Sequence, residues 1–196
     1  MSAPTKSSEA TSVNGHVPDL RADPYFYGFR DVERTLEDGT TVFEQVPLTE
    51  EDVLYPEEGD YISHNETHDD NRAYLKSAVR WRLSHIPRTW VLSDHLIDFN
   101  LPGRRAVAPD VTVLLDADDP DFSSGLYPLQ KLRADPLLLM EITSRSTRHK
   151  DFGEKMVIFG EARVPWYVIA DWRPVGGPSR FEFYIYRDSG NGMAPV

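Results

Sequence analysis

The 196-residue chain has no cysteine, which excludes disulfide scaffolds, thiolate metal sites and cysteine nucleophiles. It has no apolar run close to the roughly 18 residues that a membrane-spanning helix requires, and no signal-peptide core follows Met1. It also lacks a Gly-x-x-x-x-Gly-Lys loop, so nucleotide hydrolysis is not indicated. We therefore expect a cytoplasmic protein without a membrane partner.

Basic residues are outnumbered, with 21 Lys and Arg against 32 Asp and Glu, and the net charge of −11 argues at first against binding to nucleic acid. The charge is unevenly distributed, however. Residues 1–70 hold 17 acidic and 4 basic residues, a balance of −13, whereas residues 71–196 have a balance of +2. The overall charge therefore does not exclude a phosphate-binding site in the second part of the chain.

Composition divides the chain into three segments. Residues 1–18 are rich in Ser, Thr and Ala without apolar periodicity, which predicts a disordered tail. Residues 19–60 form an acidic arm, in which Asp38-Gly39 between two β-prone runs predicts a β-hairpin. Residues 61–190 carry the regular apolar patterns and predict the main domain.

Helix-like and strand-like patterns alternate in the main domain. Helical spacing predicts helices over residues 66–85 and around 152–160, and the acidic stretch 50–60 has room for a short one. We expect a polar loop over residues 116–135 and strands at residues 90–92, 96–99, 111–115, 137–142, 165–169 and 181–186. This order predicts an α/β fold, leaning towards α+β, with a mixed sheet flanked by helices.

Two carboxylates stand at or within apolar runs that predict buried strands. Asp110 stands at the start of the run 111–115, and Glu141 lies inside the run 137–142, where an ionised side chain needs a partner. If these strands are neighbours, both carboxylates can converge on one hard cation. Mg²⁺, or Mn²⁺ in its place, suits two carboxylates with a backbone carbonyl, and Ile142 is positioned to supply the carbonyl.

A locally basic strip surrounds the second carboxylate. Residues 131–163 hold seven basic and five acidic residues. Lys155 begins the helix that follows Glu141, and a lysine there can hold a water molecule and offset the charge of a phosphate. The side chains that we assign to phosphate contacts are Ser144, Ser146, Arg148 and Lys150.

The ordered series of motifs resembles the Uma-two family, whose members are restriction-endonuclease-like proteins of the PD-(D/E)xK nuclease superfamily. The matching segments are Pro109-Asp110, Met140 to Arg148, Asp151 with Lys155, and Arg163 to Asp171, and the resemblance covers about residues 45–190. It implies a metal-dependent phosphodiesterase core acting on DNA, with Asp110 and Glu141 as ligands. The superfamily's lysine usually lies two residues after the glutamate. Thr143 stands there, so the resemblance implies that Lys155 replaces it.

Simpler interpretations exist for both carboxylates. Asp110 follows a proline, where aspartate is a common turn residue. Glu141 is also compatible with a buried ion pair to Arg145 or Arg148.

The remaining candidates have simpler interpretations too. Lys155 is spaced to pair with Asp151 on a solvent-facing helix surface. His64 and His68 share a helical face but lack the order of a metalloprotease motif, so they fit a first-turn role, with His68 as the one that would line a cleft. Aromatic residues such as Trp81 and Trp166 fit the core better than base stacking.

The favoured hypothesis is a Mg²⁺- or Mn²⁺-dependent endonuclease that hydrolyses DNA phosphodiesters, with Asp110, Glu141 and Lys155 as catalytic residues. The alternatives are a non-catalytic module that binds nucleic acid or protein, which the acidic arm favours, and a hydrolase of RNA or another phosphoester. Cleavage of both DNA strands often uses two active sites, so the sequence is also compatible with a homodimer.

Overall fold

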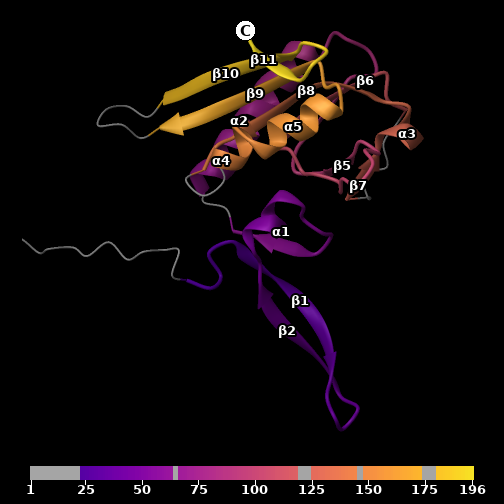
Figure 1. Ribbon diagram of the computed structural model, residues 1–196, viewed down its shortest axis with the longest axis vertical. Helices are drawn as coiled ribbons and strands as arrows, with labels where there is room; N and C mark the ends of the chain where they lie inside the picture. Colours follow the sequence, from indigo (N-terminus) through magenta and orange to yellow (C-terminus); the bar gives the residue numbers. More distant parts are fainter. Residues whose placement is uncertain (1–22, 64–65, 119–124, 145–147, 174–179) are drawn as a thin grey trace, which may run out of the picture.

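The computed structural model describes residues 23–63, 66–118, 125–144, 148–173 and 180–196 (Figure 1). The predicted tail, residues 1–18, lies outside this set. Among the described residues, no helix has the length and apolar character that a bilayer span requires.

A mixed sheet forms the centre of the main domain, as predicted. Its neighbouring strands run antiparallel except for β8 and β9, which are parallel because the chain crosses over through two helices between them. In spatial order the strands are β11 (Met193–Pro195), β10 (Arg180–Asp188), β9 (Trp166–Arg173), β8 (Asp135–Ile142), β6 (Val111–Leu115) and β4 (Trp90–Leu92).

Helices cover both faces of this sheet (Figure 1). The helix α2 (Glu66–Leu83) packs Leu75 against the face that carries Val111 and Ile142, and it ends close to the predicted boundary. The crossover helices α4 (Arg148–Asp151) and α5 (Glu154–Glu161) lie between β8 and β9 in sequence, and α5 covers the opposite face. Because side chains alternate along a strand, consecutive residues of β8 face different helices.

The predicted loop over residues 116–135 is wrong in part. It contains β7 (Leu126–Pro128) and α3 (Leu129–Leu132), and β7 pairs in parallel with β5 (Leu96–Asp98). Tyr127 is 1% exposed and packs into a cluster with Ile97 and Leu114. Such short elements are stabilised by these tertiary contacts and have too few residues to display a period.

The N-terminal arm contains the predicted hairpin, which projects from the main domain in Figure 1. Its strands are β1 (Gly28–Thr35) and β2 (Thr41–Pro47), and the turn between them includes Gly39 at φ +83°. The short helix α1 (Glu50–Leu54) and β3 (Asp60–Ile62) follow, and β3 pairs with the start of β1. Gly28, at φ +108°, is required there because a Cβ would lie 1.9 Å from the carbonyl oxygen of Tyr61.

The last strand holds α5 close to the sheet edge. A Cβ on Gly160 of α5 would lie 3.2 Å from the Cα of Gly192, just before β11. Met193 of β11 packs against the apolar cluster that includes Ile158 and Phe159 of α5. The absence of a side chain at residue 160 therefore permits this close approach of helix and strand.

Candidate active site

The pairing of β6 with β8 brings Asp110 to Glu141. Val111 pairs with Met140, and the antiparallel register therefore sets Asp110 beside Glu141. The backbone N–H of Ile142 donates to Asp110 Oδ2 at 2.8 Å, which fixes the carboxylate against β8. Both carboxylates are buried, Asp110 at 8% and Glu141 at 3% exposure.

His68, from the first part of α2, contacts the other oxygen of Asp110. Its Nε2 lies 3.0 Å from Asp110 Oδ1, and both side chains are largely buried. Burial opposes ionisation of both groups, but their hydrogen bond and mutual attraction lower the pKa of Asp110 and raise that of His68. Arg72 lies 4.0 Å from the same oxygen and is itself paired with Asp69 and Asp94. A turn role for Asp110 does not account for these contacts.

Lys155 bridges two buried carboxylates. Its Nζ lies 2.9 Å from Glu141 Oε1 and 3.0 Å from Asp151 Oδ1. The side chains of Lys155, Glu141 and Asp151 are 12%, 4% and 1% exposed. The predicted pair with Asp151 therefore exists, but in the interior, where it also includes Glu141, and not on a solvent-facing helix surface.

The pKa values reflect this crowding of charge. Burial, and then the negative charges of Asp110 and Asp151, raise the pKa of Glu141 well above its usual value. Burial also raises the pKa of Asp151, against the attraction of Lys155. For Lys155, burial favours the neutral amine, but the two neighbouring carboxylates outweigh it and raise the pKa. The ammonium therefore stays charged.

The donor set fits one additional cation. Three buried carboxylates, those of Asp110, Glu141 and Asp151, lie close to the ammonium of Lys155 and the imidazole of His68. Lys155 contacts Glu141 Oε1 and Asp151 Oδ1, whereas Asp151 Oδ2 is buried and accepts no hydrogen bond within the described part of the chain. No group of three His, Asp or Glu side chains among the described residues is placed to hold a metal by itself. Mg²⁺ is commonly bound by one or two carboxylates together with other oxygen ligands, and two carboxylates of this kind are present here.

The side chains predicted to contact phosphate differ in their surroundings. Arg148 pairs with the buried Asp171 at 3.2 Å and lies over the ring of Phe152. The Ser144 carbonyl accepts the N–H of Arg148 at 3.1 Å, and Ser144 is half-buried. Ser146 lies outside the described residues. Glu141 thus pairs with Lys155 and not with Arg148, while the alternative partner Arg145 also lies outside them.

Lys150 requires a correction. Its side chain is buried and its ammonium donates to the backbone carbonyl of Glu50 in α1. The neighbouring His149 also contacts Glu50, with 2.6 Å between Nε2 and Oε1. Lys150 thus joins the arm to the main domain and is not directed towards a phosphate.

Asp171 and Thr143 occur in the sequence motifs but were not assigned a role in the site. Asp171 is 2% exposed at the end of β9, and Thr143 Oγ1 donates to its Oδ1 at 2.5 Å. The signal for Asp171 was the same as for Glu141, a carboxylate within a β-prone run. The central position of Asp151 had no such signal, because the sequence placed it in a polar segment.

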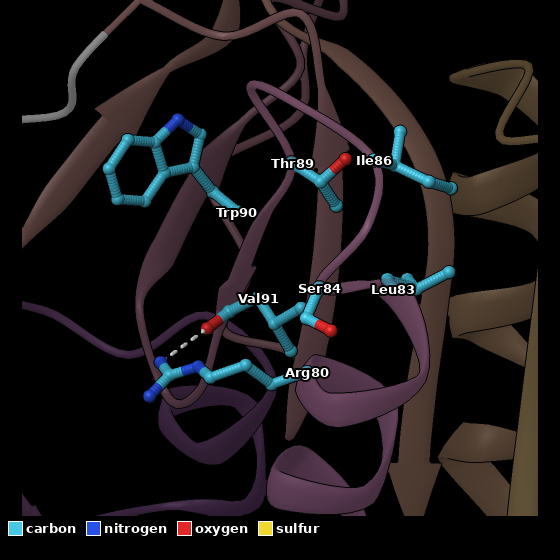
Figure 2. Close-up of a pocket in the computed structure, with 7 residues that line it drawn as sticks. All are labelled: Arg80, Leu83, Ser84, Ile86, Thr89, Trp90 and Val91. Carbon is cyan, nitrogen blue, oxygen red and sulfur yellow. Dashed lines mark hydrogen bonds between the residues drawn. The ribbon is translucent and has the colours of Figure 1, made fainter.

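A pocket of about 410 Å³ lies elsewhere, between the end of α2 and β4 (Figure 2). Arg80 points along it and donates to the carbonyl of Val91 at 3.1 Å. Helical rise places Arg80 about 18 Å along α2 from His68. The candidate carboxylates and Lys155 do not line this pocket, and it offers no comparable chemistry.

Comparisons with known proteins give one family. Residues 50–193 match the Uma2 (Uma-two) family, described as "Putative restriction endonuclease". No curated protein matches the chain. A solved structure from Anabaena variabilis ATCC 29413, described as that of a putative nuclease, aligns with a TM-score of 0.48 at 10% identity, covering 84% of this chain and 76% of that one.

Proposed function

Because this chain belongs to the Uma2 family, we propose that it is a nuclease that hydrolyses DNA phosphodiesters with the help of Mg²⁺ or Mn²⁺. The observation that carries the proposal is the convergence of Asp110 and Glu141, from two different strands, beside the buried ammonium of Lys155. The match over residues 50–193 supports the nuclease class. The gathering of three buried carboxylates, those of Asp110, Glu141 and Asp151, supports the metal.

The residues that would hold the metal are Asp110 and Glu141, with the carbonyl of Ile142. A bound divalent cation would polarise the phosphate and lower the pKa of a water molecule, so no protein nucleophile is required. His68 and the N–H of Ile142 hold both oxygens of Asp110 in place. Lys155 presents a positive charge beside Glu141, where it can orient a water molecule and offset the charge that develops on phosphate.

The flanking residues suit an orienting role. Asp171 holds both Arg148 and the hydroxyl of Thr143, which fixes the loop after Glu141 at the end of the sheet. Arg148 remains 44% exposed at its side chain while paired, so part of its guanidinium can meet a phosphate. We therefore retain Arg148 and Ser144 as phosphate contacts.

Plasmid nicking tests the function directly. Supercoiled DNA is incubated with the protein in Mg²⁺, in Mn²⁺ and in chelator, alongside the variants Asp110→Asn and Glu141→Gln. We expect metal-dependent nicking by the wild type and a loss of at least about a thousandfold in either variant, because each removes a ligand charge. Glu44→Gln in the arm, where Glu44 is exposed and pairs with Arg34, is the control and should cut normally.

The outcomes separate the rival functions. Cleavage by Asp110→Asn at the wild-type rate in Mn²⁺ would overturn the assigned site. Salt-sensitive DNA binding without nicking in any metal would favour the non-catalytic module. Cutting of RNA or of a small phosphodiester, but not of DNA, would keep the site and change the substrate. Light scattering during the same assay tests whether two copies assemble for double-strand cleavage.

A further inference from the structure

Lys155 contacts the same oxygen that a metal would need. Its ammonium lies 2.9 Å from Glu141 Oε1, a buried oxygen. A metal ion bound to the same oxygen would lie close to the ammonium, and two positive charges so close together repel strongly in a buried site. The ammonium and a divalent cation therefore compete for this carboxylate.

Asp151 offers the ammonium a second place. Asp151 Oδ1 lies 3.0 Å from the same Nζ, and the side chain is 1% exposed. Its other oxygen, Oδ2, is buried and accepts no hydrogen bond in the described part of the chain, so it can receive a further donor of Lys155. Its backbone is held independently, because the hydroxyl of Tyr167 donates to the Asp151 carbonyl at 3.0 Å.

We propose that Lys155 occupies the cation position at Glu141 in the metal-free protein, and that Asp151 is the positioning residue that retains the ammonium when a divalent cation takes over Glu141. This inference rests on the proposed function, since it assumes that Glu141 is a metal ligand. In this proposal Asp151 holds the ammonium of Lys155 and does not bind the metal. The lysine stays beside the metal, a short displacement from its first position, and so remains available to a water molecule or phosphate.

The geometry can be tested in the wild-type protein. Crystals grown without metal and crystals soaked in Mn²⁺ are compared, with the anomalous signal locating the ion. We expect Mn²⁺ between Asp110 and Glu141, the contact from Nζ to Glu141 lost, and the contact from Nζ to Asp151 retained. A bound Mn²⁺ with Lys155 still on Glu141, or with Asp151 coordinating the ion, would overturn the proposal.

A double-mutant cycle tests the same idea in solution. Calorimetric titration with Mn²⁺ compares the wild type with Asp151→Asn, Lys155→Met and the double variant. We expect Asp151→Asn to weaken Mn²⁺ binding about tenfold when Lys155 is present. In the Lys155→Met background it should weaken binding less than about threefold, because no ammonium then has to be held away from the ion. A weakening that is equal in both backgrounds would mean that Asp151 acts on the metal without Lys155, and would overturn the proposal.

Two controls complete the design. Glu161→Gln lies on the same helix and removes an exposed pair with Arg104, so it should leave Mn²⁺ binding unchanged. Circular dichroism checks folding, and the soaked wild-type crystal decides the question if Lys155→Met does not fold. Absence of Mn²⁺ binding in the wild type would overturn this proposal and the metal site together, whereas binding and nicking with an additive cycle would overturn this proposal alone.

Discussion

The arm and the main domain use the same charged residue types with opposite consequences. In the arm, β1 and β2 are exposed along most of their length, and pairs such as Arg34 with Glu44 lie in solvent, where an ion pair contributes about 0–1 kcal/mol. In the main domain, Glu141 and Lys155 pair among apolar strands and helices. Burial makes those charges dependent on one another, so the coupled charged groups gather in the main domain.

The largest contrast should appear on truncation of an aromatic residue in each region. Phe159 of α5 is 0% exposed and packs on Tyr167, with ring centroids 4.9 Å apart, whereas Phe43 of β2 is 72% exposed. We expect Phe159→Ala to lower the free energy of unfolding by about 3–5 kcal/mol. Phe43→Ala should change it by less than about 0.5 kcal/mol. Urea unfolding measures both, and equal losses would refute the contrast.

Within the arm, a glycine pair separates steric contact from backbone strain. Gly28→Ala places a Cβ against the backbone of Tyr61, whereas Gly39→Ala meets no atom within 4 Å, and both residues have positive φ. We expect Gly28→Ala to destabilise the arm by about 2–3 kcal/mol and Gly39→Ala by about 1 kcal/mol. Hydrogen exchange should show faster opening of β1 and β3 and unchanged protection of β8. Loss of protection in β8 would show that the two regions fold as one unit.

Lys150 tests the connection between the regions. Lys150→Met removes the ammonium that donates to the Glu50 carbonyl and so breaks this contact between α4 and α1. We expect a loss of about 1–2 kcal/mol, measured by urea unfolding, with faster exchange in α1. Lys131→Met, at an exposed lysine of α3, is the matched control and should have little effect. If both variants behave alike, the contact with α1 contributes nothing.

The smallest effect concerns pH and the surface of the arm. The hydrogen bonds from Thr49, helped by the charge of Arg30, lower the pKa of Asp52 and outweigh the opposing effect of burial. Because the pKa is lower in the folded state, this contribution is present above the unfolded value near 4 and is lost as pH falls through the folded value. Asp52→Asn should therefore reduce stability by less than about 1 kcal/mol at pH 7. Thermal unfolding should show the difference vanish at low pH, and a constant difference would contradict this assignment.

Much of the fold could be predicted because, in long segments, the spacing of apolar residues indicates both the type of element and the side that is buried. The run 111–115 was predicted to be a strand and forms β6, whose first four residues are buried. The helix predicted over residues 66–85 appears as α2, Glu66–Leu83. The pair β5 and β7 could not be predicted, because three-residue strands are held by side chains from elsewhere in the chain.

The candidate site was predictable where a charge breaks an apolar run. Asp110 and Glu141 were identified on that ground, and the structure places them beside each other, although their role as ligands stays a prediction. Lys150 could not be distinguished from Arg148 in sequence, because both lie in one polar segment. Only the position of α1, nearly one hundred residues earlier in the chain, decides that Lys150 is engaged in packing.

The close approach of Gly160 to Gly192 brings the C-terminal hairpin against the helix that carries Lys155. Lys155 is carried by α5, and the height of α5 above the sheet is limited by its neighbour β11. A Cβ at residue 160 would lie 3.2 Å from the Cα of Gly192, whereas a Cβ at residue 192 would meet no atom within 4 Å. A larger residue at position 160 is therefore expected to shift α5, and Lys155 with it, although no charged side chain is changed.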